Sequence, residues 1–169
     1  MPEASAPIAT PVLPEFDPAD RVRGELNATG LWFTAHPLDV LIDGDARRGS
    51  IPIRSLTDAA TAPHGATERV TLVGLRCAGR RLETKQGQIM LFSTLADHSG
   101  LAECMLLPDA YRAFADVMQA SILRVEGRLD RTLDTLTIVV ERAIALDATA
   151  LEPFADQRFR RGSQDHDMA

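Results

Sequence analysis

The chain has 169 residues, of which 45% are hydrophobic and 25% charged, a composition that fits one globular domain with extensions and excludes an intrinsically disordered protein. The net charge of −6 argues against a strongly basic nucleic-acid-binding protein, but most of the excess acid precedes residue 68, so the local pattern matters more than the total. No signal peptide is evident, and no apolar run approaches the ~20 residues that a membrane helix needs.

The first predicted element is a short helix near the start of the chain. Residues 1–16 are rich in Pro and Ala, which is typical of a flexible lead-in. Asp17 and Pro18 suit the beginning of a helix and Gly30 suits its end. We therefore expect a helix that begins at Asp17 and ends near residue 28.

An irregular arm follows this helix. It carries three large apolar residues, Trp32, Phe33 and Leu38, which we expect to pack against the helix or the main domain, because they would otherwise form an exposed patch. His36 has no cluster of Cys, His or carboxylate residues near it in the sequence. A buried turn is therefore a better interpretation of His36 than a metal ligand or a catalytic base. Residues 17–67 are interpreted as the helix, this His-Pro arm and a linker.

From residue 68 onward the pattern predicts strands. The first strand should span residues 69–78, with Gly74 marking a bend where the strand passes from one side of a barrel to the other. A polar loop over residues 79–87 comes next. Its basic residues are Arg80, Arg81 and Lys85.

Residues 88–95 predict the central strand, bounded by Gly87 and by a turn that ends at Gly100. Because side chains alternate across a strand, its two faces differ. The face that suits a barrel interior carries Ile89, Leu91, Ser93 and Leu95. The opposite face carries Gln88, Met90, Phe92 and Thr94. An aromatic ring between polar neighbours suits a stacked base whose edges are hydrogen-bonded.

Four more elements complete the predicted domain: a strand over residues 101–107, an amphipathic helix over 109–118, and strands over 121–131 and 135–146. A turn at Leu133 and Asp134 joins the last two strands, and residues 148–169 read as a flexible polar tail. Cys77 and Cys104 lie in predicted strands without metal-ligand spacing, which is typical of buried free thiols in a reducing compartment.

The order strand, strand, strand, helix, strand, strand is that of the OB-fold, an all-β, five-stranded Greek-key barrel with a capping helix. We therefore expect an OB-fold domain over residues 68–147, preceded by the helical and irregular arm. Such barrels bind oligonucleotides on the face around their second and third strands, and with the loops that join strands 1–2 and 4–5.

The predicted nucleic-acid site combines base stacking with phosphate contacts. Phe92 is expected to stack a base, and the residues around it on that face are Met90, Thr94 and Met105. The expected phosphate contacts come from Arg76, Arg80, Arg81 and Lys85, and also from Arg128, which Glu126 on the same face would partly neutralise. The sequence shows no phosphate-binding loop, catalytic triad or metal cluster, so we expect no catalytic residues, no metal and no cofactor.

Several motifs resemble a known family. The run Phe92-x-x-Leu95-x-Asp97-x-x-Gly100 is similar to the signature of nucleic-acid-binding OB domains shared with anticodon-binding modules. The helix, the His-Pro element that follows Gly30, and the later strand motifs resemble in order and spacing the C-terminal part of bacterial DNA polymerase III alpha subunits, especially their error-prone paralogue. This resemblance runs from about residue 13 to residue 147.

The resemblance implies a non-catalytic binding module, because the polymerase palm, its metal-binding carboxylates and the other polymerase domains have no counterpart in the chain. We expect the module, whether a stand-alone protein or a fragment, to bind single-stranded nucleic acid, DNA in preference to RNA, in DNA replication or translesion synthesis. The alternative is a protein-interaction adaptor of a polymerase assembly with little DNA affinity. The expected partners include DNA polymerase or replisome proteins, and the expected location is the cytoplasm, at the nucleoid and away from membranes.

Overall fold

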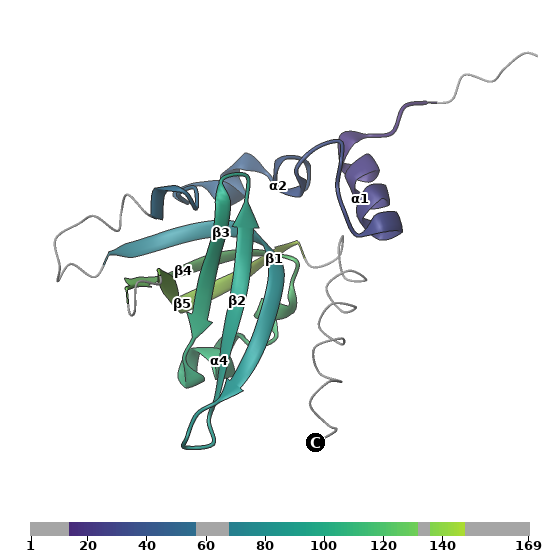
Figure 1. Ribbon diagram of the computed structural model, residues 1–169. Coiled ribbons are helices and arrows are strands. Elements are labelled where there is room, and N and C mark those ends of the chain that lie inside the picture. Colours follow the sequence, from purple (N-terminus) through teal and green to yellow (C-terminus); the bar gives the residue numbers. More distant parts are fainter. Residues whose placement is uncertain (1–13, 57–67, 132–135, 148–169) are drawn as a thin grey trace, which may run out of the picture.

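The computed structural model describes residues 14–56, 68–131 and 136–147 (Figure 1). Most of the predicted lead-in, the end of the linker, the predicted turn at Leu133 and Asp134, and the tail lie outside these residues. No helix within the described ranges is long and apolar enough to cross a membrane.

Five strands close into a barrel in the order β1-β2-β3-β5-β4. They are β1 (Arg69–Glu83), β2 (Ile89–Asp97), β3 (Gly100–Leu106), β4 (Ile122–Asp130) and β5 (Thr137–Asp147). Neighbouring strands are antiparallel except β3 and β5, which pair in parallel over three residues of each strand and so close the barrel. Helix α4 (Pro108–Phe114) and the turn η2 (Val117–Gln119) lie between β3 and β4 in the chain, with α4 at one end of the barrel (Figure 1). The predicted OB-fold with its capping helix is confirmed.

Strand β1 is longer than predicted, because it continues to Glu83 where the sequence indicated a loop from residue 79. Its second half pairs with β2 as a two-stranded hairpin, closed by a tight turn in which the Thr84 N–H donates to the Gln88 carbonyl at 2.7 Å. Gly87 in this turn has a φ of 74°, which favours glycine. The predicted basic loop is therefore wrong: Arg80 and Arg81 belong to the strand, and only Lys85 lies in the turn.

The passage of the first strand from one side of the barrel to the other, predicted at Gly74, occurs at the next residue. Up to Leu75 β1 pairs with β4, and from Leu75 onward it pairs with β2. A Cβ atom on Gly74 would lie 2.9 Å from the Cβ of Leu95, so only glycine allows β2 to approach this closely.

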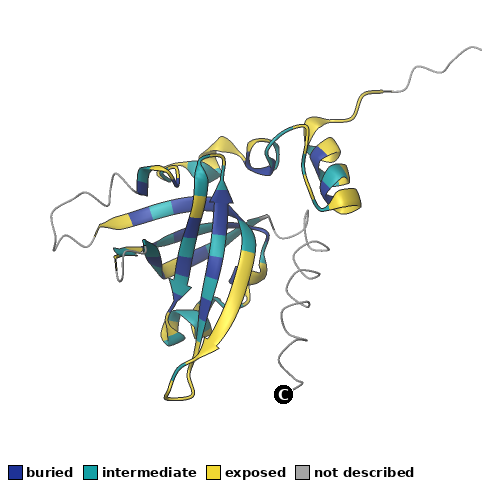
Figure 2. Ribbon diagram, viewed as in Figure 1, coloured by how far each residue is buried: buried dark blue, intermediate teal, exposed yellow. Residues whose placement is uncertain are grey.

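The barrel interior is filled by the inward side chains of all five strands. On β2, Leu91, Ser93 and Leu95 are buried as predicted, whereas Ile89 is 43% exposed because it lies at the far end of the hairpin, where β1 is exposed as well (Figure 2). The Ser93 hydroxyl donates to the Ala78 carbonyl at 3.2 Å, which satisfies the one polar group in this row. Cys77 and Cys104 form no disulfide; Cys104 is buried as predicted, whereas Cys77 is half-buried. Burial raises the pKa of the Cys104 thiol to about 12.

The arm packs on the outside of the barrel. Helices α1 (Pro18–Thr29) and α2 (Pro37–Val40) and the turn η1 (Gly44–Arg47) precede β1 in the chain. Helix α1 begins and ends as predicted: the Asp17 carboxylate accepts from the Ala19 N–H at 2.8 Å, and Gly30 has a φ of 73°. A second apolar cluster joins the arm to β1 and β4. Its buried members are Val22, Leu26, Leu38, Ile42, Val73, Leu75 and Ile122.

The prediction for the three large apolar residues of the arm holds for two of them. Leu38 is buried and Trp32 is half-buried in the second cluster, but Phe33 is 71% exposed. The backbone N–H of Phe33 donates to the Glu25 carboxylate at 2.7 Å, so the chain is fixed here by its backbone while the ring of Phe33 stays in solvent. The expected packing of Phe33 is therefore wrong.

Candidate nucleic-acid interface

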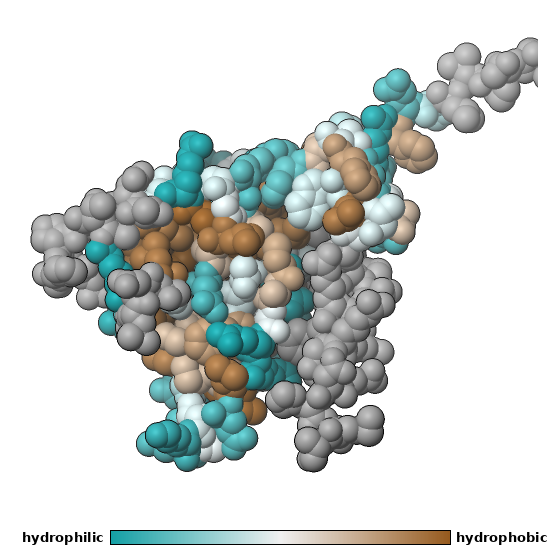
Figure 3. All heavy atoms as spheres, in the orientation of Figure 1, coloured by the Kyte–Doolittle hydropathy of each residue, from teal (hydrophilic) through white to brown (hydrophobic). Residues whose placement is uncertain are grey.

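The outer face of β2 and β3 carries the predicted stacking residue; this face is turned toward the reader in Figure 3, where apolar and hydrophilic side chains alternate on it. In the register, Phe92 lies between Arg80 of β1 and Met105 of β3, and Thr94 lies opposite Glu103. Directly opposed residues of antiparallel strands share a face, so these five side chains are neighbours. Met90 lies on the same face nearer the hairpin tip, opposite Leu82.

The side chain of Arg80 covers the ring of Phe92. Its Cζ atom is 4.8 Å from the ring centroid, which is a cation–π distance. The Nη2 atom of Arg80 is also 3.6 Å from Oε1 of Glu103. An aromatic ring, a guanidinium group and a carboxylate thus form one cluster on the outer face. Glu103 was not among the predicted site residues, because only the cross-strand register reveals its position.

Arg81 points to the opposite face of β1 from Arg80. It lies opposite the buried Leu91 in the register, and its Cζ atom is 5.9 Å from the ring centroid of Tyr111 on α4. Lys85 lies in the exposed turn at the hairpin tip. The structure therefore separates the three basic residues that the sequence grouped in one loop, and only Arg80 adjoins the stacking face.

Arg76 is also placed away from Phe92. It lies opposite the inward-facing Leu95, and its guanidinium group donates to the carbonyls of Gln119 at 3.0 Å and Ala120 at 3.3 Å. Burial lowers the pKa of Arg76. These contacts connect β1 to the segment that leads into β4, so the role of Arg76 is structural.

Arg128 lies on β4, three strands away from Phe92 along the row Phe92, Met105, Val139 and Arg128. Its Nε atom is 2.7 Å from Oε1 of Glu141. Neutralisation of Arg128 was expected from Glu126, but that carboxylate lies 3.4 Å from Nε of Arg124 instead. Arg128 is therefore paired, by a different acid than predicted.

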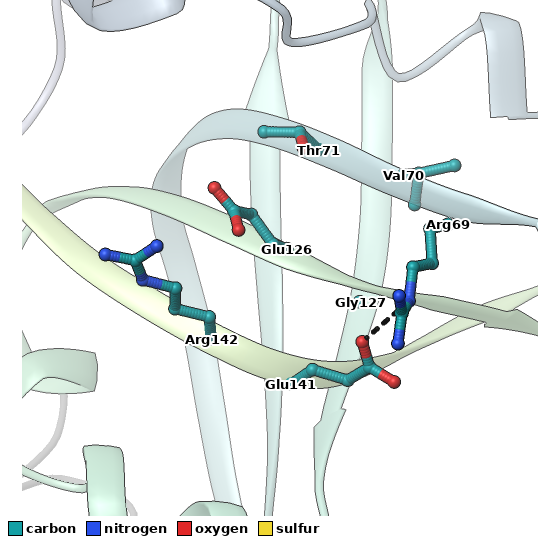
Figure 4. A pocket seen from close by; sticks show the side chains of 7 residues that line it. All are labelled: Arg69, Val70, Thr71, Glu126, Gly127, Glu141 and Arg142. Atoms are coloured by element: carbon teal, nitrogen blue, oxygen red, sulfur yellow. Dashed lines mark ion pairs between the residues drawn. The ribbon is translucent and has the colours of Figure 1, made fainter.

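A shallow hollow of about 330 Å³ lies between β1, β4 and β5 (Figure 4). Its lining residues are Arg69, Val70, Thr71, Glu126, Gly127, Glu141 and Arg142. Nε of Arg69 is 3.2 Å from Oε2 of Glu141, so Glu141 contacts two arginines, Arg69 and Arg128. Sequence reasoning missed this hollow because Glu141 sits at a register shift between β4 and β5.

The turn between β2 and β3 joins the barrel to the arm through Asp97. The Asp97 carboxylate accepts from the backbone N–H of Ile53 at 2.8 Å, of Ser99 at 2.6 Å and of Gly100 at 3.1 Å. Burial alone would raise the pKa of Asp97, but the hydrogen bonds from Ser99, Ile53 and Gly100 lower it overall. The acidic residue of the quoted signature run therefore holds the turn and the arm rather than a ligand.

His36 lies beside this turn and is half-buried, whereas the sequence indicated a buried turn. Its Nδ1 atom accepts from the Leu38 N–H at 3.2 Å, and its ring stacks on that of His98 with the centroids 4.0 Å apart. Burial and the charge of His98 lower the pKa of His36. Among the described residues no group of three or more His, Cys, Asp or Glu side chains is placed to hold a metal ion.

Comparisons with known proteins agree with the observed fold. Residues 70–146 match the family model described as an OB-fold nucleic acid binding domain. The error-prone DNA polymerase of Anaeromyxobacter dehalogenans is 32% identical over 149 residues, 88% of this chain, and that of Symbiobacterium thermophilum is 30% identical over 148 residues, 86% of this chain. The chain spans only 12–13% of the length of these relatives.

The match to the polymerases is longer than the barrel. Because it covers 149 of 169 residues, it includes most of α1 and all of α2 in addition to the five strands. Among solved structures, a mitochondrial single-stranded DNA binding protein from S. cerevisiae aligns with 12% identity and a TM-score of 0.41, covering 49% of this chain and 97% of its own. At this level of likeness no functional conclusion rests on that structure.

Proposed function

This chain is homologous to a short part of the error-prone DNA polymerases, and on that premise we propose that the outer face of β2 and β3 binds single-stranded nucleic acid, DNA in preference to RNA. The observation that carries the proposal is the half-buried ring of Phe92 on an open strand face, with a guanidinium group beside it. The module has no catalytic role in this proposal. Its task is to hold single strands during DNA replication or translesion synthesis.

The proposed site is smaller than the set of residues predicted from the sequence. Phe92 stacks one base, and Met90, Thr94 and Met105 contact it from the sides. Arg80 is 64% exposed and contacts a phosphate next to that base, while Lys85 extends the basic track to the hairpin tip. The three other predicted arginines lie off this face for the reasons given above: Arg76, Arg81 and Arg128.

The proposal is tested by fluorescence anisotropy with a labelled single-stranded oligonucleotide at low salt. Phe92→Ala should weaken binding by about tenfold or more, because stacking contributes about 1–3 kcal/mol per base. Phe33→Ala is the matched control, since it removes an equally large ring that is exposed on the arm. Equal losses in the two variants, or no binding by the unaltered protein even at low salt, would contradict the proposal.

A second candidate function is a protein-interaction adaptor of a polymerase assembly. It is favoured by three exposed large apolar side chains that precede or follow α1 in the chain: Phe16, Leu31 and Phe33. Exposed apolar groups of this kind mark interaction surfaces when they are contiguous. In this case Phe33→Ala rather than Phe92→Ala would reduce the function, through loss of binding to a DNA polymerase or replisome protein in a pull-down.

A further inference from the structure

Beside the proposed stacking position, the carboxylate of Glu103 uses only one of its two oxygen atoms in a recorded contact with the described residues. Its Oε1 atom faces the guanidinium group of Arg80 at 3.6 Å, and among the described residues its Oε2 atom has no hydrogen-bond partner. The carboxylate is only 33% exposed, and Thr94 lies directly opposite Glu103 in the register. An acid is thus fixed at the edge of the face on which Phe92 would stack a base.

The guanidinium group of Arg80, which now lies beside Glu103, is itself a planar hydrogen-bond donor. The Arg80 guanidinium lies over the Phe92 ring, and one of its nitrogens, Nη2, forms an ion pair with Glu103 at 3.6 Å. A guanine base contains the same unit, because its N1–H and its N2 amino group form a guanidine fork at one edge of a flat ring. Guanine could therefore stack on Phe92 and donate two parallel hydrogen bonds to Glu103, in place of the guanidinium.

The other bases fit this carboxylate less well. An ionised carboxylate only accepts hydrogen bonds. Thymine flanks its single N3–H donor with two carbonyl oxygens, and cytosine and adenine place a ring-nitrogen acceptor next to their amino group. Each of these edges brings at least one lone pair against the oxygens of Glu103, whereas guanine alone offers two adjacent donors.

From this geometry we infer that Glu103 makes the face selective for guanine-containing single strands, an inference that rests on the proposed function. Binding requires Arg80 to leave both Glu103 and the Phe92 ring, and the cost is small because the ion pair is long, at 3.6 Å, and the guanidinium group is 64% exposed. The released guanidinium group then contacts the phosphate next to the stacked guanine.

The test compares two labelled oligonucleotides of equal length, one all thymine and one with isolated guanines in a thymine background. The unaltered protein should bind the guanine-containing strand about tenfold more tightly, within the range that a bidentate base contact provides. Glu103→Gln should abolish this ratio of affinities. Glu141→Gln is the matched control: Glu141 is also a strand carboxylate paired with arginine and 33% exposed, and its replacement should leave the ratio unchanged.

Two results would overturn the inference while leaving the proposed function intact: equal affinity for the two strands, or a guanine preference that survives Glu103→Gln. Binding of neither strand would remove the proposed function and this inference together. Replacing the guanines by inosine, which lacks the N2 amino group, should lower the preference, and an unchanged preference for inosine would argue against the two-donor contact.

Discussion

Arg80 and Arg81 are neighbours in the chain, yet their guanidinium groups lie on opposite faces of β1, one over Phe92 and the other over Tyr111. Neighbouring residues of a strand always alternate between its two faces, and the register shift between Arg76 and Ala78 decides that Arg80 rather than Arg81 shares the face of Phe92. A shift of one residue exchanges the two faces of a strand. Replacing each arginine in turn therefore tests the effect of the strand face, because the two residues have the same charge and adjacent sequence positions.

Single replacements of these arginines should separate phosphate binding from structure. Arg80→Ala should reduce the slope of log affinity against log salt concentration by about 0.7, the value for one lost phosphate contact on a single strand. Arg81→Ala should leave that slope unchanged, because its side chain faces α4. Anisotropy titrations at several salt concentrations measure both slopes, and an equal reduction in the two variants would show that the face of β1 does not matter.

At the scale of elements, the turn between β2 and β3 fixes the arm to the barrel. Asp97→Ala removes the acceptor for the N–H groups of Ile53, Ser99 and Gly100. Leaving partly buried donors without a partner costs about 1–3 kcal/mol, so the free energy of unfolding should fall by roughly that amount at neutral pH. Urea denaturation of the two proteins measures the difference.

The same pair of proteins should show a pH dependence. The hydrogen bonds hold the pKa of Asp97 below its usual value of 3.8, so the folded state stabilises the charged carboxylate. That stabilisation is present above the unfolded-state pKa and is lost as the pH falls through the lowered folded-state pKa. The difference between the unaltered protein and Asp97→Ala should therefore shrink below pH 3.8, and a constant difference would contradict this account.

Elements with a strong local signal were predicted well from the sequence. The caps of α1, the alternation of β2 and the special position of Gly74 each follow from local chemistry. The chain order of the predicted strands and helix then indicated the OB-fold. The second half of β1 was mistaken for a loop because its side chains are exposed on both faces of the hairpin and so lack an apolar alternation.

Only the part of the candidate site that lies within one strand was predicted from the sequence. The shared face of Met90, Phe92 and Thr94 follows from alternation alone. The contacts of Arg80 and Glu103 depend on how three strands are aligned. The register shift between Arg76 and Ala78 sets the alignment of β1 with β2, and no local sequence pattern predicts it. Pairings between distant residues, such as Asp97 with Ile53, carry no sequence signal at all.

At the scale of the whole molecule, the arm and the barrel share an apolar cluster. Val73, Leu75 and Ile122 of the barrel are buried beneath the arm. A shortened chain without residues 1–67 would expose them, and each is worth roughly 1.5–3 kcal/mol when fully buried. We expect this chain to melt at a clearly lower temperature and to aggregate, as measured by circular dichroism and light scattering. An unchanged melting temperature would mean that the barrel does not depend on the arm.

The net charge of −6 and the small number of cations on the stacking face suggest that the isolated module binds weakly. Weak binding suits a module that works beside a larger protein, because tethering raises the effective concentration of the strand at the site.

The parallel junction between β3 and β5 has a consequence for folding kinetics. The two strands meet over only three residue pairs and are separated in the chain by α4, η2 and β4. Three pairs are fewer than any other two neighbouring strands of the barrel share, so this junction has the least strand pairing to hold it closed. Glu103 and Met105 belong both to this junction and to the proposed base-binding face. A bound strand would thus hold together the least extensively paired junction of the barrel, and the lifetime of the closed barrel would rise with its occupancy.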